Sequence, residues 1–272
     1  MNEIEKINNA IWNLWQKYPR EAGFITPKFV KEPTRNTLLF LGLNPSFPKA
    51  GNWQNNCKWQ NHWQTIKKLG LFDDENDTDY RQAFLWERSE KIFEENRKTA
   101  IELFAFIHHD ARSYYPKWFK RLNCLAKKLG VEREKYDHVD LFLWADASSE
   151  SIETRVAILA GHKIVNAQKC LAKQLLKICQ PKMIVCVYKN AWEHFRKLYS
   201  ICPGEMMEHT LQGEKGNAVL KYAEVKIDGM INSVTVIGCP NLPRGYGKYQ
   251  IGKEHLRNLF CFLNECWGAG KK

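Results

Sequence analysis

Short, continuous apolar runs alternate along the chain with longer segments in which apolar residues recur at helical spacing. Strands buried on both faces are predicted for the runs 37–43, 139–145 and 183–188. Two further strands, at 219–227 and 231–237, flank the turn signal Asp228-Gly229. Amphipathic helices are predicted at about 4–14, 80–107, 117–129, 164–179, 191–198 and 253–266. This alternation predicts an α/β fold with a central, mostly parallel sheet flanked by helices on both faces.

Composition adds a partner class to this picture. The chain of 272 residues is 44% hydrophobic, which suits a sizeable core, and we find no internal repeat or low-complexity linker. We therefore expect one domain over residues 1–272. A formal net charge of +11 favours a polyanionic partner, with nucleic acid ahead of an acidic membrane surface or a role in solubility alone.

The cysteines and the apolar runs bear on location and cofactors. No apolar run approaches the roughly 20 residues that span a bilayer, and the N-terminus has no signal-peptide core. The nine cysteines form no C-x-x-C pair, which is typical of free thiols in a reducing compartment. The adjacent His108 and His109 do not share a helix face. We expect a cytoplasmic protein without a metal or a cofactor.

Two segments with unusual chemistry follow predicted strands. Asn44, Pro45 and Ser46 come after the first strand, and the run Cys239-Pro240-Asn241 comes after the last. Ligands in open α/β sheets bind beyond the carboxyl ends of the strands. The sequence therefore predicts a binding site formed by these two segments.

Four sequence blocks resemble the uracil-DNA glycosylase superfamily, most closely its mismatch-specific and single-strand-selective branches. The blocks are residues 39–46 with the pattern Gly-x-Asn-Pro, residues 61–71, residues 166–185 and residues 236–241. They occur in family order, from about residue 37 to residue 265. The resemblance implies a uracil-DNA glycosylase-like fold in which residues 80–135 are a helical insertion without a clear family counterpart.

The resemblance also implies an activity, namely hydrolysis of the N-glycosidic bond of a deaminated or damaged, uracil-like base in DNA. Asn44 would position the attacking water, and Asn241 is the candidate to stabilise the leaving base, because Cys239 occupies the position of the family's usual His or Asn. The predicted substrate-binding residues are Gly42, Leu43, Pro45, Ser46, Phe47, Trp53, Trp59 and Asp146. One of the three aromatic residues would stack on the base, and Asp146 would contact the base edge. Asn44 as a turn residue and Asp146 as a helix cap are the structural alternatives.

The loop after the last strand is the predicted DNA contact. Its candidate residues are Pro240, Leu242, Pro243, Arg244, Tyr246 and Lys248. Leu242 or Pro243 would wedge into the base stack, and Arg244 would bind phosphate; a surface loop with solvated cations is the alternative. The segment 114–121 mixes aromatic residues and cations, as in a single-strand surface or a helix start. A catalytically inactive DNA-binding module and a nucleoside or nucleotide hydrolase remain the rival functions.

Overall fold

The computed structural model describes residues 1–17, 26–43, 64, 67–69, 96–109, 116–132, 135–145, 154, 156–213, 216–240, 242 and 255–269. The chain divides into two compact units. The first unit comprises residues 1–32, 44–114 and 142–171, and the second comprises residues 33–43, 115–141 and 172–272. The single domain expected over residues 1–272 stays a prediction.

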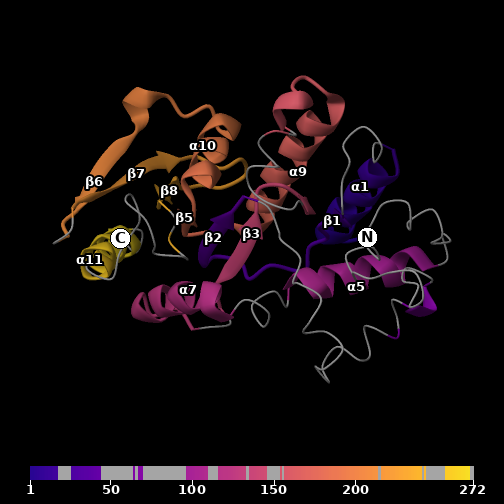
Figure 1. Cartoon of the computed structure of the whole chain (residues 1–272), viewed down its shortest axis with the longest axis horizontal. Coiled ribbons are helices and arrows are strands. Elements are labelled where there is room, and N and C mark those ends of the chain that lie inside the picture. The colour runs from indigo at the N-terminus through magenta and orange to yellow at the C-terminus, as the bar shows by residue number, and fades with distance from the viewer. Residues whose placement is uncertain are drawn as a thin grey trace. The chain divides into compact units, whose positions relative to one another are not determined.

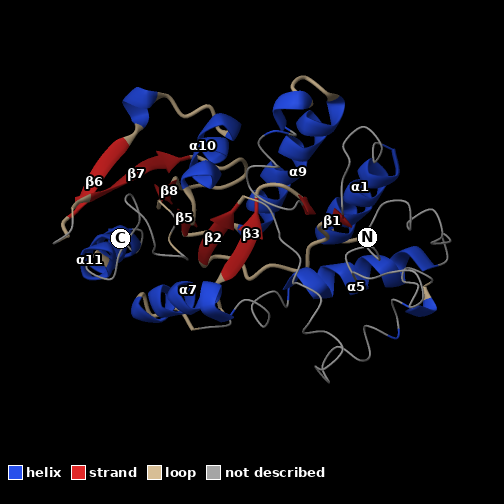
Figure 2. Cartoon of the chain, in the orientation of Figure 1, coloured by secondary structure: helices blue, strands red, loops and turns tan. Residues whose placement is uncertain are grey.

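The second unit is built on a six-stranded sheet (Figures 1 and 2). Its strands are β2 (Leu38–Gly42), β3 (Asp137–Asp140), β5 (Met183–Cys186), β6 (Met207–Leu211), β7 (Ala218–Val225) and β8 (Val234–Gly238). Their spatial order is β3-β2-β5-β8-β7-β6. The first four strands in that order run parallel, whereas β7 and β6 are antiparallel additions. The predicted α/β fold with a mostly parallel sheet is confirmed.

Helices pack on both faces of this sheet. They are α7 (Pro116–Lys128), α9 (Lys163–Cys179), α10 (Lys189–Leu198) and α11 (Leu256–Ala269), and a short 3-10 turn covers Pro203–Glu205. Tyr222 of β7 pairs with Ile237 of β8, and its ring contacts Phe262 of α11 at 5.1 Å between centroids. The next residue, Gly238, faces Trp192 of α10. Successive residues of a strand point to opposite faces, so α11 and α10 cover different faces, as Figure 1 shows.

The second predicted parallel strand lies earlier than its apolar run. The run 139–145 predicted one strand, but β3 ends at Asp140, residues 141–143 form bends, and Trp144–Ala145 forms a separate strand, β4. This prediction was wrong because pairing with β2, and not local hydropathy, sets the register: Leu39 pairs with Asp137 and Gly42 with Asp140. The shift brings two more polar residues, Asp137 and His138, into the sheet beside Asp140.

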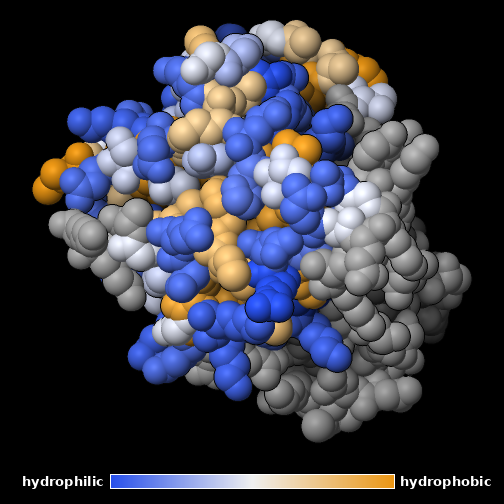
Figure 3. Space-filling model, turned by 90° about the vertical axis from the view of Figure 1, so that its left-hand side faces the viewer, coloured by the Kyte–Doolittle hydropathy of each residue, from blue (hydrophilic) through white to orange (hydrophobic). Residues whose placement is uncertain are grey.

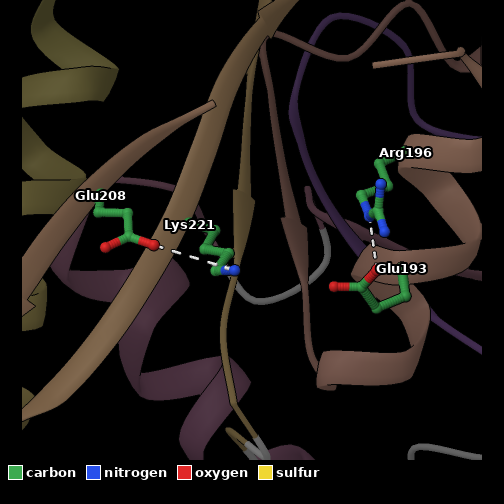
Figure 4. Close-up of polar contacts among 4 residues, drawn as sticks. All are labelled: Glu193, Arg196, Glu208 and Lys221. Atoms are coloured by element: carbon green, nitrogen blue, oxygen red, sulfur yellow. Dashed lines mark hydrogen bonds and ion pairs between the residues drawn. The ribbon is translucent and has the colours of Figure 1, made fainter. Parts of the chain in front are cut away.

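The antiparallel edge of the sheet has a turn with a glycine and a surface ion pair between its strands, and α10 has an ion pair of its own. Gly229, in the predicted turn between β7 and β8, has a φ of 80°, a conformation that favours glycine. Glu208 of β6 lies opposite Lys221 of β7, and their charged atoms are 3.9 Å apart. A second pair, Glu193 with Arg196 at 2.5 Å, lies within α10 (Figure 4). The edge strand β6 has mostly exposed side chains and was not predicted.

The first unit is held together by an aromatic cluster and a buried amide. Its described elements are α1 (Glu3–Lys17), β1 (Thr26–Pro27), β4, α5 (Arg97–His109) and the start of α9. The rings of Trp12, Trp15, Phe29 and Phe104 pack against one another. The buried Asn8 side chain donates a hydrogen bond to the Val30 carbonyl at 2.8 Å and accepts one from the Val30 N–H at 2.9 Å.

Several predicted helices agree with the described elements. Those at 117–129, 164–179 and 191–198 are confirmed as α7, α9 and α10. Only part of the helical stretch predicted at 80–107 can be compared, because residues 80–95 lie outside the described residues. Across the described ranges, no helix is both long and apolar enough to cross a membrane.

Candidate functional site

The two strands that precede the motif segments lie on either side of β5. Leu41 of β2 pairs with Cys186 of β5, and Cys186 pairs with Gly238 of β8, so the three strands end in register. All three are parallel, and neighbouring strands lie about 4.8 Å apart. Leu43 and Cys239 therefore leave the same edge of the sheet, about 10 Å apart across β5. This is the edge at which open α/β sheets bind ligands.

The chain beyond β8 stays attached to the sheet instead of leaving it. The Cys239 N–H donates to the Cys186 carbonyl at 2.9 Å, and the Leu242 N–H donates to the Val187 carbonyl at 2.9 Å. Arg121 of α7 donates from Nη1 to the Leu242 carbonyl at 3.3 Å. The Leu242 side chain is fully buried. The start of the predicted DNA-contact loop is thus fixed by both β5 and α7.

This placement bears on the predicted wedge. A residue that enters a base stack must project from the surface, whereas Leu242 packs inside the protein, so its predicted wedging role does not fit this structure. Pro240 is half-buried, while Gly42 and Leu43 lie at the end of β2 and are buried. The other predicted site residues lie outside the described residues: Asn44, Pro45, Ser46, Phe47, Trp53, Trp59, Asp146, Asn241, Pro243, Arg244, Tyr246 and Lys248.

A buried polar cluster, which was not predicted, lies at the ends of β2 and β3. His138 and Asp140 share one face of β3, and His138 Nε2 is 3.8 Å from Asp140 Oδ1. The carboxylate fits there because β2 has a glycine in register: a Cβ at Gly42 would lie 2.0 Å from Asp140 Oδ1 and 3.0 Å from His138 Nε2. Phe119 of α7 meets the His138 ring edge-on, at 5.3 Å between centroids. The cluster places an ionisable pair beside Gly42, which is two residues before Asn44 in the sequence.

The sequence contained a signal for this cluster that the apolar pattern outweighed. Asp137, His138 and Asp140 immediately precede the run Leu141-Phe142-Leu143. Polar residues at strand positions that face a close-packed helix indicate a hydrogen-bonded or ionic group in the interior. The signal can be interpreted only when the register of β3 with β2 is known, because that register places these polar residues inside the sheet.

Cys239, which follows directly after β8, is a neutral thiol. It is fully buried, and burial raises its pKa to about 12. Burial and, to a smaller extent, the nearby Cys239 also raise the pKa of Cys186 well above its ordinary value. Neither side chain carries charge near neutral pH. Cys239 therefore supplies no cation to a departing base and no thiolate nucleophile.

The N-terminus of α10 provides a positive potential at the same edge. The helix begins at Lys189, three residues after β5 ends, and its N-cap residue Tyr188 makes no side-chain capping bond. The first N–H groups of a helix carry partial positive charge and attract anions. Trp192 packs on Gly238, and its buried indole N–H has no hydrogen-bond partner among the described residues. This edge of the sheet thus has a neutral hydrogen-bond donor, the Trp192 indole N–H, and the positive end of the α10 dipole.

In the described part of the chain, no three His, Cys, Asp or Glu side chains gather as possible metal ligands. Comparison with known proteins assigns no family: no family model, curated protein or solved structure matches the chain. A function can therefore be proposed only from the geometry of the sheet edge and from the motifs.

Proposed function

We propose that this protein is a DNA glycosylase that hydrolyses the N-glycosidic bond of a deaminated or damaged, uracil-like base. One observation carries the proposal: β2 and β8, which precede the two motif segments, end in register on either side of β5. Leu43 and Cys239, which are 196 residues apart in sequence, thus leave the sheet at one edge, where open α/β folds bind ligands.

The chemistry assigns a role to each part of this edge. Departure of the base leaves an oxocarbenium-like sugar and a base anion, and both need stabilisation. Asn44 directs a water through its amide oxygen, which is a poor proton acceptor, so the enzyme depends on binding and geometry and turns over slowly. Asn241 and the N-terminus of α10 face the developing negative charge, a role for which the neutral thiol of Cys239 is unsuited.

A base-release assay tests this proposal. Labelled oligonucleotides carrying uracil, hypoxanthine, thymine opposite guanine or an alkylated base, single- and double-stranded, are incubated with the protein and cleaved with alkali. The Asn44→Ala protein is compared with wild type, and Asn166→Ala, at an exposed position of α9, is the matched control. We expect release from at least one substrate, a loss of about 100-fold in Asn44→Ala, and no loss in the control. Equal release by all three proteins refutes the role of Asn44.

One observation favours a second function, a DNA-binding module without catalysis. The neutral Cys239 thiol occupies the position at which the family has its usual His or Asn. Salt-dependent DNA binding with no release from any substrate would establish this function in place of the first.

The proposal includes location and partners. The eight described cysteines are free thiols, the state that a reducing compartment maintains. We therefore infer a cytoplasmic location, and we propose DNA as the partner because of the formal net charge of +11.

A further inference from the structure

Helix α7 carries an unusual concentration of positive charge. Its 13 residues, Pro116–Lys128, include four lysines and Arg121 but no acidic residue. The whole chain has 41 basic and 30 acidic residues. This single helix therefore contributes five of the charges that make the protein basic, without internal compensation.

The positive charges of α7 are sorted onto its solvent face. Lys120, Lys127 and Lys128 are exposed, and Arg121 is half-exposed. Positions seven and eight residues apart lie on the same side of a helix, about 10 Å apart along its axis. The opposite side, with Phe119, Leu122, Leu125 and Ala126, is buried against the sheet. We call Lys120, Arg121, Lys127 and Lys128 the α7 cationic face.

The buried apolar side decides which polyanion this face fits. A helix that binds lipid inserts its apolar side between the acyl chains. In α7 the residues of that side already pack in the protein core. From Phe119 to Lys128, the described exposed side chains are three lysines and Cys124, with Arg121 and Asn123 half-exposed. Figure 3 shows the side of the protein that carries β6 and α11, where hydrophilic side chains cover most of the described surface. A row of cations with no large apolar side chain exposed among residues 119–128 matches a phosphate backbone, because about 10 Å of duplex carries roughly six negative charges.

Two contacts hold the cationic face in a fixed position relative to the candidate site. Arg121 binds the Leu242 carbonyl, at the end of the segment that follows β8. Lys128 Nζ lies 4.0 Å from the centroid of the Phe260 ring of α11. Both contacts lie within the second unit. The helix thus presents its cations beside the segment that contains Asn241.

We propose that the α7 cationic face binds the phosphate backbone of the DNA whose base occupies the site at the ends of β2 and β8. The face belongs to residues 80–135, which have no clear counterpart in the family that the motifs resemble. It binds DNA independently of sequence and positions the strand, and base recognition takes place at the sheet edge. The inference rests on the proposed function for the identity of the polyanion.

A structural role for the same lysines makes a different prediction. Lys127 and Lys128 lie in the last turn, where cations stabilise the helix dipole. In that case their replacement would lower the thermal stability and leave the salt dependence of DNA binding unchanged. Lys120 lies one turn from the start of the helix and has no favourable interaction with the dipole.

The test uses the full chain and undamaged duplex DNA, so it does not depend on base release. One variant combines Lys120→Gln, Lys127→Gln and Lys128→Gln, and a second omits Lys128→Gln to retain the contact with Phe260. The control combines Lys163→Gln, Lys169→Gln and Lys177→Gln, which removes three exposed lysines from α9. Binding is measured by fluorescence anisotropy from about 50 to 200 mM salt. The same proteins are tested on vesicles of phosphatidylglycerol and phosphatidylcholine.

We expect the slope of log affinity against log salt concentration to fall by about 2.7 in the triple α7 variant, and by about 1.8 in the double variant. At about 0.1 M salt, binding should weaken by at least roughly 10-fold in the triple variant. The α9 control should lose less than half of this. Equal losses in the α7 and α9 variants, an unchanged slope, or a defect on vesicles alone would overturn the inference. Failure of the glycosylase assay would leave these results standing as evidence of a DNA-binding surface.

Discussion

Replacement of Gly42 by alanine is expected to destabilise the protein through one identifiable clash. The new Cβ would lie 2.0 Å from Asp140 Oδ1 and 3.2 Å from Asp140 Cγ. Unstrained heavy-atom contacts lie near 3.5 Å, so the carboxylate must move by more than about 1 Å. Asp140 is almost completely buried and lies beside His138, which restricts that movement. Overpacking of this kind costs about 1–3 kcal/mol, and we expect the upper half of that range.

Thermal unfolding followed by circular dichroism measures this effect. A loss of about 2–3 kcal/mol lowers the unfolding temperature of a chain of this size by roughly 4–10 °C. Gly204→Ala is the matched control, because a Cβ there meets no atom within 4 Å, and we expect its unfolding temperature to stay within about 2 °C of wild type.

A double-mutant cycle separates the clash from any general sensitivity of β2. Asp140→Ala removes both of the carboxylate atoms that Gly42→Ala would meet. The double variant should therefore be more stable, by at least about 1 kcal/mol, than the sum of the two single changes indicates. Strict additivity, or a Gly42→Ala protein as stable as wild type, would refute the pairing of these two residues.

Two further predictions concern buried polar groups. In the unfolded chain the Cys239 thiol has a pKa near 9.0, whereas burial in the folded protein raises its pKa to about 12. Because only the unfolded chain then ionises between these values, the stabilisation by the protonated thiol is complete below pH 9 and is lost as the pH rises towards 12. By urea unfolding, wild type should lose about 1 kcal/mol more than Cys239→Ala between pH 8 and pH 10, and equal losses would contradict the buried thiol. Asn8→Ala removes two hydrogen bonds to Val30 and should lower the free energy of unfolding by about 2–4 kcal/mol. The exposed control Asn166→Ala should lower it by less than about 0.5 kcal/mol. A smaller loss in Asn8→Ala would show that water replaces the amide.

The parts of the fold that could be predicted are those in which local pattern and tertiary environment agree. The runs that became β2 and β5 are buried on both faces, so every residue is apolar and the pattern does not depend on register. Helix α9 was predicted to within one residue, because its apolar stripe and the following Pro181 mark both its face and its end.

The parts that could not be predicted depend on contacts between distant segments. β3 begins with Asp137 and His138, which local hydropathy excludes from a buried strand, and it accepts the Asp140 carboxylate because Gly42 lies in register. β6 is an edge strand with mostly exposed side chains and forms only because β7 supplies its hydrogen bonds. At the candidate site, position 239 was recognised as a motif residue. Its full burial, and therefore its neutral state, depends on the strand beside it.

The cations that would bind DNA and the groups that would act on a base lie on different elements of the protein. Cations gather on α7, whereas the end of β8 presents the neutral Cys239 and the start of α10 presents backbone donors. A departing base anion next to an exposed row of lysines would be screened by water and salt, whereas oriented dipoles in a buried edge keep their full effect. In the proposed glycosylase, DNA affinity would come from α7 and the rate of base release from the sheet edge. Variants of α7 should then change DNA affinity without abolishing base release at saturating DNA, while Asn44→Ala should reduce release by about 100-fold and leave affinity intact.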